Sequence, residues 1–241
     1  DHWLDTEAFE KDPVGELERL YVKFQGEMKE DPALGDSARA ELAKLQSGDE
    51  RNTALWERFR DVSRGCFDVL YGRLGVVFDV TYGESHYNDR LGPLVDSLLE
   101  QGIAEHSEGA VCVFFRDEDG ENVLPPFLIR KRDGAALYAT TDLATVELRM
   151  ETWRPSRIIY VTDHRQKLHF QQLFATCERM GVDTDFVHVG FGIMSSPEGS
   201  LSTRSGNAIP LDQLLDEAER RARAVLVERA ASGGSLVPGE E

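Results

Sequence analysis

The sequence has 241 residues, of which 41% are hydrophobic and 29% are charged, and its formal net charge is −17 at pH 7. This length is enough for one large domain or two small ones, and the composition is typical of a folded globular protein. The negative charge argues against a general nucleic-acid-binding module, which needs a basic face, and no apolar run approaches the ~18 residues of a membrane span.

The predicted elements begin with helices. Apolar residues recur at helical spacing from Ala38 to Leu74, and Gly48 divides this stretch into two helices, with Asp49 as the N-cap of the second. Val76–Val80 reads as a short strand. Residues 82–88 read as a polar loop, and residues 91–101 as a helix that ends at Gly102.

The middle of the chain changes character. The runs Ala110–Phe115 and Phe127–Arg130 read as strands, with a turn at Asp117–Gly120 between them and a second turn at Asp133-Gly134. This pattern predicts a small antiparallel β insert.

Strands and helices then alternate. We expect strands at 136–139, 157–161 and 186–189, with helices at 142–151 and 164–180 between them. Such alternation with short connections predicts a parallel sheet with right-handed crossovers, and therefore an α/β fold. An amphipathic helix follows, with one apolar face that runs from Leu211 to Leu226.

Three polar side chains fall where this reading places the carboxyl ends of strands, the usual ligand-binding edge of an open α/β sheet: Tyr138, Asp142 and Gln166. A carboxylate, a hydroxyl and an amide carbonyl together complement a guanidinium, which offers five donors in one plane. Each residue alone also has a purely structural interpretation. Asp142 would suit the first turn of a helix, Gln166 would suit a capping box begun at Asp163, and Tyr138 would suit strand packing.

Other candidate sites are weaker. The loop 200–207 consists mostly of small residues around Arg204, a combination suited to a polyphosphate. His164 and His169 lack the spacing of a zinc helix, so we expect no protein-held metal ion. The three cysteines are far apart and form no C-x-x-C pair, so we expect buried or half-buried thiols. Without a basic and apolar leader, we expect a cytoplasmic protein.

Several segments, in this order, resemble the catalytic domain of arginyl-tRNA synthetase, a class I aminoacyl-tRNA synthetase. They are Lys44–Glu50, Tyr71–Leu74, Gly83–Asn88, Glu108–Ala110, Tyr138–Ala144, His188–Gly192, Ser202–Asn207 and Leu214–Ala218.

The resemblance implies an arginine–tRNA ligase that forms arginyl-adenylate from arginine and ATP, with Mg²⁺ expected to accompany ATP, and then transfers arginine to tRNA. It implies that Tyr138, Asp142 and Gln166 bind the arginine side chain. It also implies an ATP site whose members are His188, Phe191, Gly192, Ile193, Ser202, Thr203 and Arg204. In this comparison Phe191–Ile193 lies against adenine, and the loop 200–204 corresponds to the K-M-S-K-S element, with Ser200 in place of its first lysine.

The sequence departs from the family in one further respect, because no H-x-G-H motif occurs in it. We therefore expect an internal piece of the enzyme that is inactive by itself. Residues 1–103 would be a helical connecting region, 104–137 the β insert, 138–207 the second half of the nucleotide-binding fold, and 208–241 the start of the helical region that follows. Two alternatives are a non-catalytic arginine-binding paralogue and an unrelated nucleotide-binding α/β protein.

Overall fold

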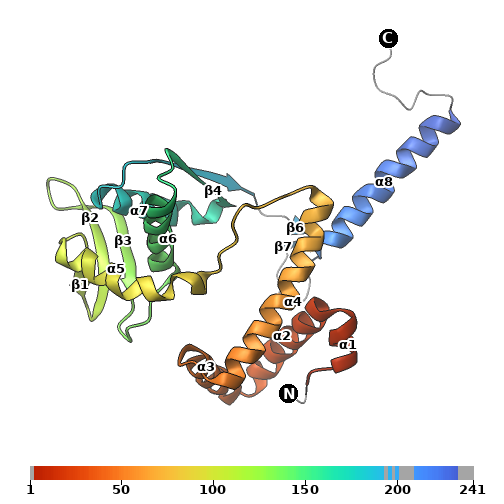
Figure 1. Ribbon diagram of the computed structural model, residues 1–241, viewed down its shortest axis with the longest axis horizontal. Helices are drawn as coiled ribbons and strands as arrows, with labels where there is room; N and C mark the ends of the chain where they lie inside the picture. Colours follow the sequence, from red (N-terminus) through yellow and green to blue (C-terminus); the bar gives the residue numbers. More distant parts are fainter. Residues whose placement is uncertain (1–2, 193–194, 197–198, 201–208, 233–241) are drawn as a thin grey trace, which may run out of the picture. The chain divides into compact units, whose positions relative to one another are not determined.

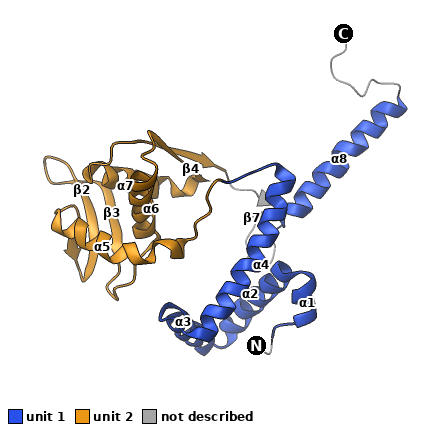
Figure 2. Cartoon of the chain, viewed as in Figure 1, with its two compact units in different colours: residues 1–78, 194–241 blue, residues 79–193 orange. Residues whose placement is uncertain are grey.

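The fold was analysed in a computed structural model, which describes residues 3–192, 195–196, 199–200 and 209–232. The chain forms two compact units (Figure 2). One comprises residues 1–78 and 194–241, and the other comprises residues 79–193. The four segments expected from the sequence remain a prediction.

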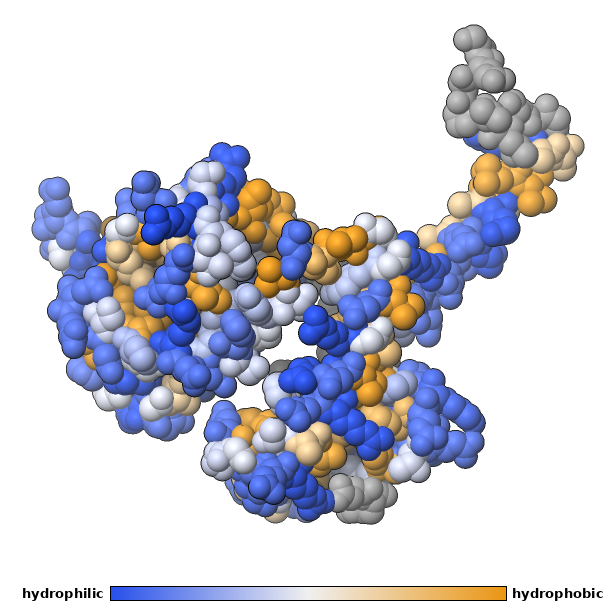
Figure 3. All heavy atoms as spheres, in the orientation of Figure 1, coloured by the Kyte–Doolittle hydropathy of each residue, from blue (hydrophilic) through white to orange (hydrophobic). Residues whose placement is uncertain are grey.

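The first unit is mainly helical (Figure 1). Its elements are α1 (Thr6–Lys11), α2 (Pro13–Glu30), α3 (Ala33–Gln46), α4 (Glu50–Leu74), the short strands β6 (Ser195–Ser196) and β7 (Gly199–Ser200), and α8 (Leu211–Ala231). The predicted break at Gly48 is confirmed, and the Asp49 carboxylate caps α4 by accepting a hydrogen bond from the Asn52 N–H. Near the end of α8, Val225, Leu226 and Val227 are exposed, and orange spheres mark hydrophobic residues there (Figure 3).

The predicted strand Val76–Val80 is wrong. Helix α4 ends at a left-handed Gly75, and the residues that follow form no strand although the structure describes all of them. An extended segment is stable as a strand only when a neighbour pairs with its backbone, and none of the described strands pairs with this segment. Val77 is 90% exposed, so this β-branched residue does not lie on the half-buried surface that favours a strand.

A buried carboxylate connects the start of the chain to α2. Glu16 is only 3% exposed, and its carboxylate accepts hydrogen bonds from the Asp5 backbone N–H and from the Arg19 guanidinium, at 2.8 and 2.6 Å. Arg19 also donates to the Trp3 carbonyl oxygen. The Arg19 guanidinium, helped by the Asp5 N–H, lowers the pKa of Glu16 from 4.5 to about 2.

We expect Glu16→Gln to destabilise this helical unit at neutral pH. Because the folded-state pKa of Glu16 is depressed, its contribution is fully present above about pH 4.5 and is lost as the pH falls towards 2. Thermal unfolding followed by circular dichroism should show a gap between wild type and variant at pH 7 that narrows below pH 4.5. Glu10→Gln, at an exposed position, serves as the control. A difference in stability between wild type and Glu16→Gln that is the same at neutral and at acidic pH would contradict the lowered pKa of Glu16.

The second unit combines helices with two sheets. Its elements are η1 (Glu84–Tyr87), α5 (Asn88–Glu100), β1 (Glu105–Ser107), β2 (Ala110–Arg116), β3 (Asn122–Arg130), α6 (Tyr138–Thr152), β4 (Arg157–Asp163), η2 (His164–Gln166), α7 (Lys167–Arg179) and β5 (Asp185–Phe191). The fully buried side chains of its core come from both helices and strands. They include Leu98, Val113, Ile129, Leu143 and Leu173.

The antiparallel insert is confirmed. Its strand order is β1-β2-β3, and β2 pairs antiparallel with β3 in a register that places Val113 opposite Phe127. Gly120 and Gly134 both have φ near +85°, in the left-handed region that the two predicted turns need. Of the three free thiols, those of Cys112 and Cys177 are buried and that of Cys66 is half-buried, as expected.

The α/β class is also confirmed, but one predicted strand is a helix. β4 and β5 pair in parallel, with Tyr160 opposite His188, and α7 connects them. Residues 136–139 do not join this sheet. Ala136 makes only an isolated bridge to Arg130, and α6 begins at Tyr138, where the Thr140 N–H bonds the Leu137 carbonyl. The buried Thr140 hydroxyl also donates to the Ile129 carbonyl, and this bond fixes the first turn of α6 against β3.

Over the described residues, no helix combines the length and apolar character needed to cross a membrane.

Candidate functional site

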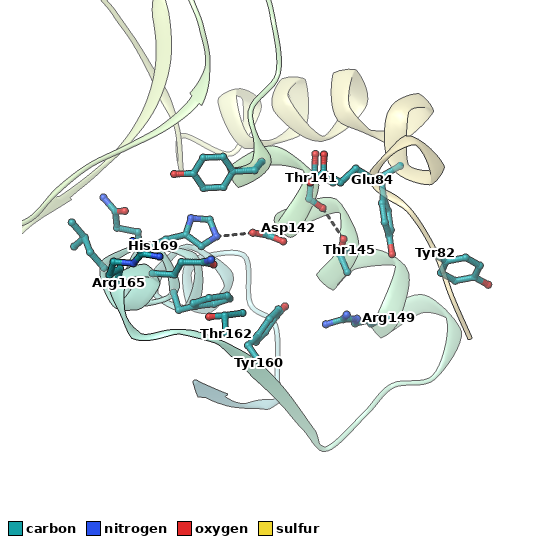
Figure 4. A pocket seen from close by; sticks show the side chains of 16 residues that line it. Tyr82, Glu84, Thr141, Asp142, Thr145, Arg149, Tyr160, Thr162, Arg165 and His169 are labelled. Atoms are coloured by element: carbon teal, nitrogen blue, oxygen red, sulfur yellow. Dashed lines mark hydrogen bonds and ion pairs between the residues drawn. The ribbon is translucent and has the colours of Figure 1, made fainter. Parts of the chain in front are cut away.

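A cavity of about 890 Å³ lies within the second unit, between α6, the end of β4 and the start of α7. Tyr138, Asp142 and Gln166 all line it. Figure 4 shows the side chains around this cavity, with Asp142 directed towards His169. The three residues that the sequence analysis grouped together thus line one cavity, although Tyr138 and Asp142 reach it from a helix and not from a strand end.

Helix α6 supplies two of these residues. Tyr138 is its first residue and Asp142 is four residues further on, so both side chains lie on one face of the helix. Tyr138 is 64% exposed, while the Asp142 side chain is 32% exposed. Both are therefore accessible to a ligand in the cavity.

The turn after β4 supplies Gln166, the third of these residues. Asp163 ends the strand, and its carboxylate accepts a hydrogen bond from the Arg165 backbone N–H at 2.8 Å and pairs with the Arg165 guanidinium. The Arg165 side chain, followed by its backbone N–H, lowers the pKa of Asp163. This pairing orders the short helix η2, at whose end Gln166 enters the cavity wall.

His169 contacts the Asp142 carboxylate directly. Its Nε2 lies 2.6 Å from Asp142 Oδ2, so the contact joins α7 to α6 (Figure 4). This pair was not predicted from the sequence, where His169 was compared only with the spacing of a zinc helix. Its position three residues after Gln166, on the same side of a predicted helix, was the available signal.

Charged groups of both signs line the cavity. Glu84, which stood out in the sequence only as part of a family segment, adds a second carboxylate to the cavity wall. The Arg149 guanidinium lies 5.4 Å from the centre of the Tyr160 ring, and burial raises the pKa of the Tyr160 hydroxyl. Arg165 is already paired with Asp163, and the Arg149 guanidinium lies over the Tyr160 ring, while Asp142 and Glu84 contribute two carboxylates to the cavity wall.

A smaller cavity of about 250 Å³ lies beside β5 and is lined by His188, Gly190 and His164 among others. His188 Nε2 lies 2.9 Å from the Thr162 hydroxyl, and its ring stacks on Phe170. A Cβ on Gly190 would lie 3.2 Å from His164 Cα, so a side chain at this position would crowd the turn that follows β4.

The remaining predicted ATP residues are only partly described. Phe191 is the last residue of β5, its carbonyl oxygen lies 3.2 Å from His164 Nδ1, and Gly192 follows it. Four of them lie outside the described residues: Ile193, Ser202, Thr203 and Arg204.

Comparison with known families gives a match over nearly the whole chain. Residues 2–234 match the family described as tRNA synthetases class I (R), catalytic domain.

Curated relatives carry the name arginine–tRNA ligase. The protein from Fusobacterium nucleatum is 46% identical over 228 residues, and that from Clostridium beijerinckii is 43% identical over 231 residues. Each match covers 95% of this chain and 40% of the relative. The chain therefore spans about two fifths of the length of these relatives.

Solved structures agree on the fold. The arginyl-tRNA synthetase from Plasmodium falciparum matches with a TM-score of 0.66 and 26% identity, over 83% of this chain and 34% of that one. The Thermus thermophilus arginyl-tRNA synthetase matches with a TM-score of 0.58 and 20% identity, over 86% of this chain and 39% of that one. The second match supports the fold alone.

Proposed function

Because the chain belongs to the class I (R) tRNA synthetase catalytic-domain family, we propose that it forms part of an arginine–tRNA ligase. The substrates would be arginine, ATP and tRNA. In the first step an oxygen of the arginine carboxylate attacks the α-phosphorus of ATP, the bond to the bridging oxygen breaks, and pyrophosphate leaves. The arginyl-adenylate formed in this way then transfers its arginyl group to a terminal ribose hydroxyl of tRNA, and AMP is released.

The observation that carries this proposal is the convergence of Tyr138, Asp142 and Gln166 on one cavity. A guanidinium has five N–H donors in a plane and no acceptor, so it needs acceptors arranged around it. The Asp142 carboxylate supplies charge, and the Tyr138 hydroxyl and Gln166 carbonyl supply neutral acceptors. A lysine ammonium cannot satisfy the same planar arrangement, and the site therefore favours arginine.

On the ATP side, family membership supports a role for His188 and the segment that follows it. We assign Phe191, Gly192 and Ile193 to the adenine, and Ser202, Thr203 and Arg204 to the departing pyrophosphate. Among the described residues, no cluster of three or more His, Cys, Asp or Glu side chains is placed to hold a metal ion. As the family resemblance implies, Mg²⁺ would accompany ATP, and the protein would contribute positioning and charge stabilisation.

A chimera tests the proposal. These residues would replace the matched 228 residues of the Fusobacterium nucleatum arginine–tRNA ligase, to which they are 46% identical. With tRNA present, we expect ATP–pyrophosphate exchange that depends on arginine and is not supported by lysine. The 241-residue chain alone, assayed in parallel, should show none.

Two results would contradict the proposal that the chain forms part of an arginine–tRNA ligase. A folded chimera that binds arginine but catalyses no exchange would favour the non-catalytic paralogue. A folded chimera that binds ATP but not arginine would favour an unrelated nucleotide-binding function.

A further inference from the structure

We propose that His169 is a positioning residue: it holds the Asp142 carboxylate, and the ring of Tyr138, in the orientation that receives a guanidinium. The identity of the ligand rests on the proposed function. The contact itself does not, and the two are tested separately below.

The first argument is the position of His169 among the three proposed arginine ligands. Its Nε2 is 2.6 Å from Asp142 Oδ2, and its ring centroid is 4.9 Å from that of Tyr138. It also lies three residues after Gln166, about one helical turn away. The His169 side chain thus contacts two of these residues, and the third lies about one helical turn away along the chain.

The second argument is that the ring has little freedom to move. His169 is only 9% exposed, and its ring packs against Phe127 at 5.4 Å and Phe170 at 5.1 Å. These aromatic residues come from β3 and α7. Because packing fixes the imidazole, its hydrogen bond fixes one oxygen of Asp142 in turn.

The third argument concerns the proton on the imidazole. Nε2 must carry hydrogen to bond a carboxylate oxygen. Within the described part of the chain, the buried Nδ1 has no hydrogen-bond partner. Because Nε2 already carries one hydrogen, a hydrogen on Nδ1 would make the ring a buried cation with an unsatisfied donor, and an unsatisfied buried charged group costs more than a neutral one. The geometry therefore favours the neutral ring with its hydrogen on Nε2, held by Asp142.

The neutral form matters for binding. A neutral imidazole bonds Asp142 without cancelling its negative charge, and the carboxylate keeps further lone pairs for a ligand. A positively charged ring would instead compete with the guanidinium for the same carboxylate. His169 would thus orient the carboxylate and leave its charge available to the substrate.

A simpler interpretation is that the pair only joins α6 to α7. Under that interpretation, removing the bond would change stability without changing arginine recognition. The two interpretations differ in their predictions for the tautomer and for the pattern of variants.

The tautomer is measured by long-range ¹H–¹⁵N spectra of the histidine-labelled 241-residue chain, with the His169 signal assigned from its loss in His169→Gln. We expect the Nε2–H form in the wild type, and a mixture of tautomers in Asp142→Ala. An Nδ1–H form, or a wild-type spectrum indistinguishable from that of Asp142→Ala, would overturn the proposal whatever the protein's function is.

Recognition is measured in the chimera by comparing His169→Phe, which keeps a ring but no donor, with His169→Gln, whose amide can donate near the position of Nε2. We expect the arginine KM to rise about tenfold in His169→Phe and to recover largely in His169→Gln, since a hydrogen bond to a charged group is lost and then replaced. Equal KM values in all three proteins, or equal losses in both variants, would reduce His169 to a structural residue. A wild-type chimera without exchange activity would count against the proposed function and leave the spectroscopic result standing.

Discussion

Replacing Leu173 by alanine is expected to lower the free energy of unfolding of residues 79–193 by about 2–5 kcal/mol. Leu173 lies in α7 and is fully buried in the core of the second unit. Its truncation removes apolar surface from the interior and leaves a cavity that close-packed neighbours cannot fill. Because α7 carries His169 and begins just after Gln166, this loss would also loosen the site.

Urea unfolding can isolate this effect because the second unit contains a single tryptophan, Trp153. Replacing Trp3 and Trp56 with phenylalanine makes fluorescence report residues 79–193. The matched control is Leu168→Ala on the same helix, where the leucine is 42% exposed and the loss should be about 1 kcal/mol or less. Equal losses at the two positions would mean that α7 does not pack in the core as the structure shows.

The helices were predictable from the sequence because their signals are local. The breaks at Gly48 and Gly102 come from glycines with φ of +81° and +68°, and Asp49 supplies a cap within three residues of its partner. Apolar spacing identified α4, α7 and α8 for the same reason. Parallel strands β4 and β5 were found because their apolar runs are short and flanked by helical patterns.

The two wrong strand predictions depended on contacts between residues far apart in the sequence, which no local pattern contains. Residues 76–80 have the pattern of a strand, but no described strand pairs with them. Residues 136–139 have the same pattern, but Thr140 donates a hydrogen bond to the Ile129 carbonyl and α6 begins at Tyr138. β-propensity describes how well a residue suits a half-buried pleated surface, and only the fold decides whether such a surface is present.

In the candidate site, too, the features set by local sequence were predicted and the long-range contact was not. Tyr138 and Asp142 were grouped with Gln166 because each follows an apolar run, and the structure does place them on one cavity, though by way of α6. The contact between Asp142 and His169 spans 27 residues and depends on how α6 and α7 pack. Chemical type and spacing could therefore suggest the ligands, but not the side chain that orients them. Their role in binding arginine stays a prediction.

Asp142→Asn is expected to weaken arginine binding by roughly 1.5–3 kcal/mol, which corresponds to about a 10- to 150-fold rise in the arginine KM of the chimera. The substitution keeps the size of the side chain and an oxygen that can accept the His169 hydrogen bond. It removes the negative charge that would pair with the guanidinium. The ATP KM should stay unchanged, because ATP is assigned to the β5 side of the unit.

The matched control is Asp183→Asn, which removes the same charge from an exposed residue just before β5, at the amino end of the parallel pair. Both variants change the net charge of −17 by the same amount. An effect seen only in Asp142→Asn is therefore due to that carboxylate and not to the net charge. If Asp142 holds the guanidinium equally in the ground and transition states, the arginine KM rises and kcat stays constant. If anchoring the side chain also places the attacking carboxylate, kcat falls as well. An arginine KM that Asp142→Asn leaves unchanged would refute the guanidinium assignment, and with it the reason why this cavity should select arginine.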